Sequence, residues 1–390
     1  MPDMARQGKD GMAKQQAGRS DRLRAALRAR PYLPTGGGRI EAIDLARGIA
    51  IGLMILSHGV SGLLGIRQVP DWGMVPIHLI TKFSSSLFIL VFGIALAVAF
   101  LPHADAEDWP RRRMKLWLRA LVVLFWYKIL TVVEMLPLYQ PQDIVDTLLY
   151  RRFPIWVEIL GFYAIALLWV PLILPVWKRA PLWGRLASPV LMALLAYLLG
   201  RYSVFGDNEP LQALLIEHDD HYTWGQLSRG PLVLVGLLIG EAVLRCYWKP
   251  DLRWRLVKML AGAGGVLLLT FFALAAPALG EQLMAVARNV GKHPPELMFM
   301  LFSVGGALVI LALALLGGER LASWLRPITL VGTDALKAFI FHIVAIFLVM
   351  RYLFEMWQVF SYPQVLGISL ALIVVTGLWI RLTTWIKVKS

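Results

Sequence analysis

Apolar residues along the chain gather into long runs of about 20 positions, separated by shorter segments that carry most of the charged residues. As an α-helix, a run of this length spans the roughly 30 Å hydrocarbon core of a bilayer. The pattern predicts an all-α, polytopic integral membrane protein with about ten transmembrane helices. These are expected at about 43–65, 76–100, 114–137, 155–177, 186–204, 230–247, 256–279, 296–317, 328–350 and 363–386.

The polar segments between the runs predict how the chain is oriented. Basic clusters such as "DWPRRRMK", "RCYWKPDLRWRLVK" and "GGERLASWLR" fall on alternate connections, together with both ends of the chain. Cytoplasmic loops carry the excess of lysine and arginine in membrane proteins. We therefore expect both termini to be cytoplasmic and the 201–229 connection to lie outside.

Composition supports this class of protein and excludes others. The chain of 390 residues is 58% hydrophobic and only 16% charged, whereas soluble domains are about a quarter charged. Its single cysteine, Cys246, excludes an internal disulfide framework and a cysteine-based metal cluster. The net charge of +14 follows the predicted topology rather than one binding face, so no nucleic-acid partner is expected.

The first 38 residues lack an apolar run and carry eight lysines and arginines. We predict a disordered basic cytoplasmic tail over 1–38, followed by one transmembrane domain over 39–390. A cleavable signal peptide would need a short apolar core of its own. The basic side chains could also contact anionic membrane lipid.

Three ionisable residues lie within the first apolar run, "RIEAIDLARGIAIGLMILSH". On an α-helix, the eleven positions from Arg47 to His58 turn the chain by about 1100°, within about 20° of three full turns. Asp44 lies about 60° from Arg47, so the three residues share one stripe. The rise places His58 about 16 Å deeper than Arg47. A cation at the membrane surface and an imidazole at mid-depth suit a site that holds an anionic carrier while its reactive end reaches inward.

A plainer interpretation of this stripe remains open. Arg47 could anchor the helix at the headgroups and pair with Asp44, while His58 bonds a neighbouring carbonyl. This explains Arg47 well but His58 poorly, because a polar ring at mid-depth is costly without a function.

Other candidates are less distinctive. His342 in the ninth run is a second candidate for the active site, and Asp334 and Lys337 before it could simply neutralise each other. Arg119, in the third run, is a better donor for phosphates than the "RRR" cluster before it. Four further ionisable residues lie inside or at the ends of the runs: Lys82, Lys128, Glu134 and Glu158. Of these, Lys128 and Glu134 could be buried partners or snorkelling ends and are weak cavity candidates. His293 with its two following prolines is expected to set the start of the eighth helix.

The "EHDDH" segment of the outer connection contains His218 and His221 beside acidic residues. This spacing alone is a weak metal signal. A solvated acidic loop is the preferred interpretation, and no metal is expected.

The order of three motifs resembles a known group of enzymes. Arg47 and His58 within "IDLARGIAIGLMILSH" resemble the first-helix signature of the acyltransferase 3 family, in the transmembrane acyltransferase superfamily. The run "FSSSLFILVFGIALAVAF" looks like that superfamily's second helix, including Phe88 and Gly93. The segment from "VGKHPPELMF" to "IFHIVAIF" is similar to bacterial relatives of the heparan-α-glucosaminide N-acetyltransferase family.

The resemblance implies a function in the cell inner membrane. An acyl group, acetyl by default, would pass from cytoplasmic acyl-CoA to a hydroxyl or amine of an extracytoplasmic envelope glycan or glycolipid. Arg47 and Arg119 would bind the phosphates of acyl-CoA, and Asp44, His58 and His342 are the candidate catalytic residues. Histidine is the usual general base for such a step, and a covalent acyl-histidine is the two-step alternative. The two halves point to different branches, so the choice between His58 and His342 stays open.

A transporter or exporter of an envelope precursor is the alternative class of function. It would also have about ten helices and buried charges. Many transporter folds carry internal repeats, and we find no convincing similarity between the two halves of this chain.

Overall fold

The protein is described here by a computed structural model, which covers residues 24, 28 and 38–389. The predicted basic tail lies outside these residues, except at 24, 28 and 38. Within the described residues, ten helical segments are long and apolar enough to cross a membrane, and each corresponds to one predicted run. The all-α, polytopic fold is thereby confirmed. In the described part of the chain, extended pairing is limited to one isolated bridge between His218 and His221.

Five of the ten segments are single helices at the start and middle of the chain. They are α2 (Glu41–Leu63), α5 (Trp109–Met135), α7 (Glu158–Arg179), α8 (Leu182–Arg201) and α10 (Gln226–Cys246). The second segment, Gly73–His103, joins η2 (Gly73–His78), α3 (Leu79–Thr81), α4 (Phe83–Phe100) and η3 (Leu101–His103). Pro189 and Pro231 lie inside α8 and α10 without ending either helix.

The remaining segments follow the same alternation of helix and short connection. The seventh joins α11 (Pro250–Ala275), η4 (Ala276–Ala278) and α12 (Leu279–Ala287), and the eighth is α13 (Leu297–Trp324). After the short α14 (Arg326–Thr333), the ninth joins α15 (Ala335–Ile343) to η5 (Val344–Leu353), and the tenth belongs to α16 (Tyr362–Lys389). Besides α14, three short helices lie in connections: η1 (Ile66–Gln68), α6 (Pro141–Leu148) and α9 (Glu209–Ile216).

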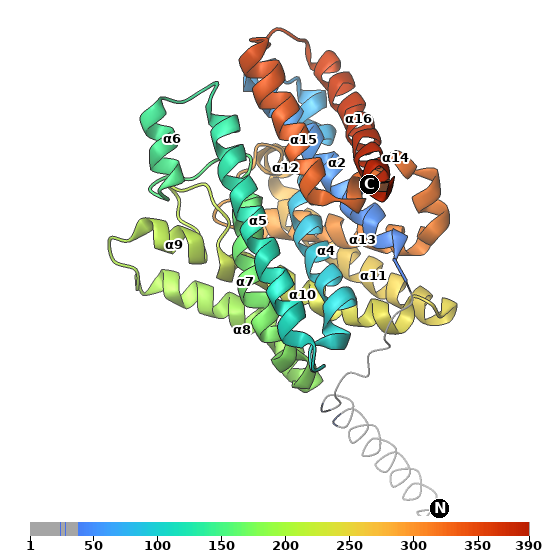
Figure 1. The fold of residues 1–390 in the computed structure, drawn as a ribbon. Coiled ribbons are helices and arrows are strands. Elements are labelled where there is room, and N and C mark those ends of the chain that lie inside the picture. The colour runs from blue at the N-terminus through green and yellow to red at the C-terminus, as the bar shows by residue number, and fades with distance from the viewer. Residues whose placement is uncertain (1–23, 25–27, 29–37, 390) are drawn as a thin grey trace, which may run out of the picture.

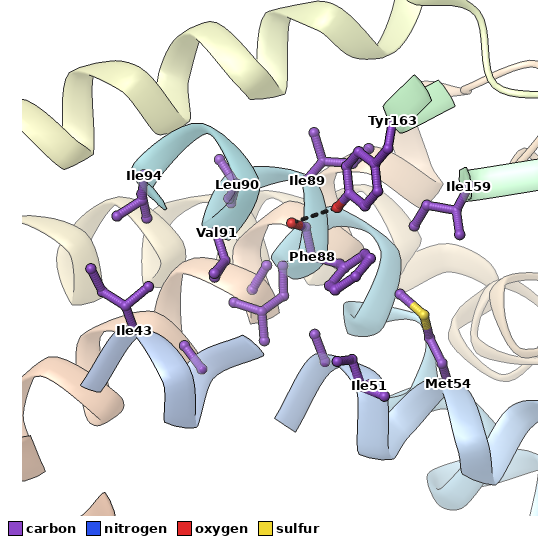
Figure 2. Packing of buried hydrophobic residues seen from close by; sticks show 14 of the residues in the cluster. Ile43, Ile51, Met54, Phe88, Ile89, Leu90, Val91, Ile94, Ile159 and Tyr163 are labelled. Carbon is purple, nitrogen blue, oxygen red and sulfur yellow. Dashed lines mark hydrogen bonds between the residues drawn. The ribbon is translucent and has the colours of Figure 1, made fainter. Parts of the chain in front are cut away.

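Helix α2 lies at the centre of the bundle, which explains why it tolerates polar residues. It contacts α4, α13, α14 and α16 (Figure 1). Figure 2 shows Ile51 and Met54 of α2 around Phe88 of α4, whose carbonyl oxygen accepts a hydrogen bond of 2.9 Å from Tyr163 of α7. By contrast, α8 exposes most of its apolar residues, as expected of a helix that faces lipid. The polar stripe of α2 therefore faces protein.

Helices α2 and α14 approach closely because each presents a glycine at the crossing. A Cβ atom on Gly48 would overlap the carbonyl oxygen of Ile328, and one on Gly332 would overlap the carbonyl oxygen of Asp44. Small residues at such crossings allow helix backbones in membranes to touch. This contact holds the end of α14 against the first turns of α2.

The predicted continuous helix at 328–350 is wrong in one respect. Helix α14 ends at Thr333, and Asp334 has a non-helical conformation with φ −141° and ψ 86°. The Asp334 side chain then accepts a hydrogen bond of 3.2 Å from the backbone N–H of Lys337 and caps α15. Aspartate favours this N-cap position over a helix interior. The apolar run therefore contains two helices, and the ninth span starts only at Ala335.

Candidate active site

Two histidines from distant parts of the chain meet inside the bundle. His58 lies on α2 and His342 on α15, and their Nδ1 and Nε2 atoms are 3.1 Å apart. The rings are stacked, with centroids 5.3 Å apart and an angle of 25° between their planes. Phe339 packs edge-on against both rings. We call these two residues the histidine pair.

The hydrogen bonds around the pair determine which nitrogen carries each proton. The Nδ1 atom of His342 lies 2.8 Å from the carbonyl oxygen of Ala338, which can only accept, so Nδ1 must be protonated. In a neutral His342, Nε2 is then an acceptor, and Nδ1 of His58 must donate to it. The free lone pair of a neutral His58 is consequently on Nε2.

Access distinguishes the two members of the pair. His342 is completely buried, whereas His58 keeps part of its surface accessible. Within the described residues, no protein group forms a hydrogen bond with Nε2 of His58. A basic nitrogen held in a fixed orientation and left open at its tip can accept a proton from a bound molecule.

Arg47 is held in place toward the N-terminal end of the same helix. Its Nη1 atom donates to the Asp44 carboxylate at 3.2 Å and to the carbonyl oxygen of Gly332 at 2.8 Å. Asp44 also accepts a hydrogen bond from Arg39. The hydrogen bond from Arg47 to Gly332 depends on the close crossing of α2 and α14. These contacts hold the Arg47 side chain in place, and about a fifth of it stays exposed.

A cavity of about 270 Å³ opens beside Arg47, and we call it the arginine cavity. Arg119 of α5 also lines it, so the two predicted donor-binding arginines share one space. The remaining walls are mostly apolar. They come from α4, α5, α7 and the start of α15, and include Phe88, Phe92, Leu160, Tyr163, Leu167, Asp334 and Leu336.

The predicted site residues thus form two groups rather than one. His58 and His342 lie together, while Arg47 and Arg119 lie together at the cavity. Asp44 belongs with the second group, because its contacts are with Arg39 and Arg47. The rise of α2 separates the two groups by about 16 Å. Tyr163 and Phe88, which line the cavity, also belong to the apolar core around the middle of α2 shown in Figure 2.

The weaker candidates have partners of their own. Lys128 donates to the carbonyl oxygen of Leu148 at 2.9 Å and lies 3.3 Å from the ring centre of Tyr150. Glu134 is buried and accepts from the backbone N–H of Ile155 at 2.8 Å. Both lie outside the two groups. The Asp334 and Lys337 side chains are 3.6 Å apart, which confirms their expected pairing.

The sequence patterns do not predict a buried polar network that forms around Glu217. Glu217 pairs with Arg229 at 2.7 Å and with Nδ1 of His293 at 3.0 Å, and all three side chains are almost fully buried. The two prolines after His293 directly precede the start of α13 at Leu297, and the His293 side chain itself belongs to this network. The "EHDDH" and "KHPP" segments carry two of these residues, but sequence spacing could not show that they meet.

Burial and neighbouring charges shift the pKa values of His293 and Glu217 in this network. Burial lowers the pKa of His293 to about 4, against the opposing effect of Glu217. Burial raises the pKa of Glu217, but Arg229 and His293 outweigh it and hold that pKa below its ordinary value. The network therefore contains a neutral imidazole beside an ionised carboxylate at neutral pH.

The candidate metal ligands of the 201–229 connection do come together. Glu209, His218 and His221 each offer one atom, and these atoms lie within 4.8 Å of one another. Nε2 of His221 is 3.3 Å from the Glu209 carboxylate, so an ion pair accounts for this contact equally well. Glu209 is more than half exposed. The expectation that no metal binds stays a prediction.

Comparison with known proteins gives one result. The model of a family described as an acyltransferase domain, acyltransferase 3, matches residues 40–383. The matched region contains every helix that contributes to the two groups. Searches of curated proteins and of solved structures find no match.

Proposed function

The chain belongs to the acyltransferase 3 family, and from this membership we propose a specific reaction for it as a multi-pass membrane acyltransferase. The donor is cytoplasmic acyl-CoA, with acetyl as the default acyl group. The acceptor is a hydroxyl or amine of an extracytoplasmic envelope glycan or glycolipid, and the enzyme resides in the cell inner membrane.

The arginine cavity supports the choice of donor. Coenzyme A carries several phosphate charges, and guanidinium groups bind phosphate through paired, charge-assisted hydrogen bonds. Arg47 is fixed by Asp44 and Gly332, and Arg119 lines the same cavity. The apolar walls suit the uncharged arm that carries the thioester. We place the nucleotide end of the donor at the arginines and the thioester toward His58.

The observation that carries the proposal is the orientation of the histidine pair. In the direct reaction, the acceptor oxygen attacks the thioester carbonyl while Nε2 of His58 takes the proton from that oxygen. The carbon–sulfur bond breaks, and the thiolate of CoA recovers the proton from the His58 imidazolium. His342 accepts from Nδ1 of His58 throughout and stabilises the charged ring.

A two-step reaction uses the same atoms. Nε2 of His58 would attack the thioester carbonyl first, so that the carbon–sulfur bond breaks, the CoA thiolate leaves and an acyl-histidine forms. The acceptor would then take the acyl group from Nε2 and give its proton to the thiolate. Intact-mass spectrometry of the protein with acetyl-CoA and no acceptor distinguishes the two routes. An added acetyl group that disappears on addition of acceptor supports the covalent route.

Membrane vesicles of defined orientation test the proposed function. Radiolabelled acetyl-CoA should label membrane carbohydrate in inverted vesicles, whose cytoplasmic face is outward, and much less in right-side-out vesicles. Vesicles with His58→Ala provide the background, and His103→Ala provides a matched histidine control. Equal labelling in wild-type and His58→Ala vesicles would contradict the proposal.

A further inference from the structure

Lys82 is a buried lysine for which the described residues provide no partner. It lies between α3 and α4 and is only 5% exposed. Among the residues that the structure describes, none forms a hydrogen bond or ion pair with its ammonium group. A lysine is almost never buried in this way unless something neutralises it.

Lys292 approaches the same region from the connection between α12 and α13. Its Nζ atom donates to the Tyr222 hydroxyl at 2.8 Å and lies 5.6 Å from the ring centre of Trp224. Burial lowers the pKa of Lys292, but Tyr222 and Glu158 outweigh it and keep that pKa above its ordinary value. Lys292 is therefore positively charged at neutral pH.

Lys292 links Lys82 to the catalytic histidine. The ammonium of Lys292 interacts electrostatically with both Lys82 and His58. Helix α3, directly before Lys82, also contacts α2. His58 and Lys292 each keep part of their surface accessible. Lys292 thus brings positive charge near the histidine pair, and His58 lies about 16 Å along α2 from Arg47 and the arginine cavity.

The nearby carboxylates do not balance this charge. Glu217 is already paired with Arg229. Glu158 accepts a hydrogen bond of 3.0 Å from Trp224 and interacts electrostatically with Lys292. Lys82 is left without a carboxylate partner in the described part of the chain, and burial favours the neutral form of such an amine unless an anion lies beside it. A bound anion would stabilise the charged form of Lys82 next to the charged Lys292.

We propose that Lys82 and Lys292 bind a negatively charged group of the acceptor, a phosphate or carboxylate attached to a sugar, and so place its hydroxyl or amine beside His58. This rests on the proposed function, because it assigns the lysines to the acceptor of that reaction. The acceptor is then an anionic glycan or glycolipid rather than a neutral one.

Binding to purified protein in detergent tests the anion site without relying on turnover. Calorimetry would compare glucose 1-phosphate, glucuronate, glucose and inorganic phosphate as probes. At least one of the two sugar anions should bind tenfold or more tightly than glucose and than inorganic phosphate, since charge-assisted bonds are the strong ones. Whether phosphate or carboxylate is preferred identifies the group.

Two variants of Lys82 test whether anion binding depends on this side chain or only on the overall charge of the protein. Lys82→Met should remove the preference for the sugar anion at least tenfold, whereas Lys82→Arg should retain it. Lys128→Met is the matched control, because Lys128 is a half-buried lysine whose bonds lie elsewhere, and it should bind like wild type. Lys82→Met should also fold at least as stably as wild type, because it removes a buried polar group that has no protein partner among the described residues.

The outcomes distinguish the inference from the function on which it rests. Glucose binding as tightly as both sugar anions, inorganic phosphate binding as tightly as either, or an equal loss in Lys128→Met, would overturn the anionic acceptor. Release of CoA from acetyl-CoA by the same preparation would leave the acyltransferase reaction standing in that case. Sugar-anion binding that depends on Lys82, without binding or turnover of acetyl-CoA, would instead contradict the proposed donor.

Discussion

The two rings of the histidine pair differ in what their remaining nitrogen can do. Both nitrogens of His342 are committed, one to Ala338 and one to His58. His58 retains one open lone pair, and a proton accepted there is stabilised through Nδ1. We therefore assign the base to His58 and a positioning role to His342.

Substitution of each ring tests this assignment. We expect His58→Ala to reduce acceptor acylation by a factor of roughly 10²–10⁴, the usual contribution of a general base, with CoA affinity changed less than about threefold. His342→Gln offers an amide oxygen near the former Nε2 and should lose less activity than His342→Ala. Acylation rates and calorimetric CoA binding check both. Near wild-type turnover in folded His58→Ala protein would transfer the role to His342.

Arg47 should contribute to donor binding through the shape of its guanidinium group. Arg47→Lys keeps the charge but loses the planar fork that grips phosphate in two places, so we expect weaker CoA binding, and Arg47→Ala should lose about tenfold or more. Arg112→Ala is the matched control, since Arg112 pairs with Asp108 outside the cavity. Unchanged CoA affinity in both Arg47 variants would contradict donor binding and indicate that Arg47 only anchors α2 at the headgroups.

His293 predicts how stability depends on pH. Its pKa is about 4 in the folded protein and 6.5 in its ordinary state, so between these values the unfolded chain binds a proton that the folded protein excludes. Stability should fall as the pH drops from about 6.5 toward 4, by up to about 3 kcal/mol from this group. The low pKa of Glu217 acts in the same direction.

Melting curves at pH 7.5 and pH 5 measure this loss. His293→Gln removes the titrating ring while keeping a donor for Glu217, so its melting temperature should depend less on pH than that of wild type. His103→Gln, at the end of η3 and outside this network, should behave like wild type. A wild-type melting temperature that rises on acidification would contradict the assignment.

At the scale of helices, the crossing of α2 and α14 positions Arg47. Gly48→Ala should push the two helices apart and destabilise the protein by about 1–3 kcal/mol, the usual cost of overpacking. CoA affinity should fall with it, because Gly332 accepts a hydrogen bond from Arg47. Gly52→Ala on the same helix is the matched control, since its Cβ would lie 3.6 Å from Ile373, an ordinary contact. Equal melting temperatures for the two variants would argue against the tight crossing.

The sequence predicts helices well here and their interruptions poorly. Run length and hydropathy are local properties, and they identify all ten spans, including α8 and α10 with their internal prolines. The break at Asp334 depends on one side chain capping α15 within an otherwise apolar run, which periodicity does not register. The contact of His58 with His342 and the network around Glu217 join distant segments, so local spacing could name their members but not pair them.

At the scale of the whole molecule, sidedness decides whether donor and acceptor can meet. In a Cys246→Ser background, cysteine at Glu107, in the α4–α5 connection, should resist an impermeant maleimide in intact cells. Cysteine at Asp207, in the α8–α9 connection, should react. Both positions are exposed, and Asp207 avoids the neighbouring Asn208, whose side chain caps α9. The opposite labelling would place the arginine cavity on the wrong face for cytoplasmic acyl-CoA.

The histidine pair joins residues 284 positions apart in the chain, and this separation has a consequence for biosynthesis. At roughly 5–20 residues per second, a ribosome needs on the order of tens of seconds after His58 before it adds His342. A nascent or interrupted chain can thus present Arg47 and Arg119 while His58 still lacks its partner. We expect a chain that stops at residue 333 to release no CoA from acetyl-CoA. Unfinished copies of the protein would then leave the cellular pool of acyl-CoA intact.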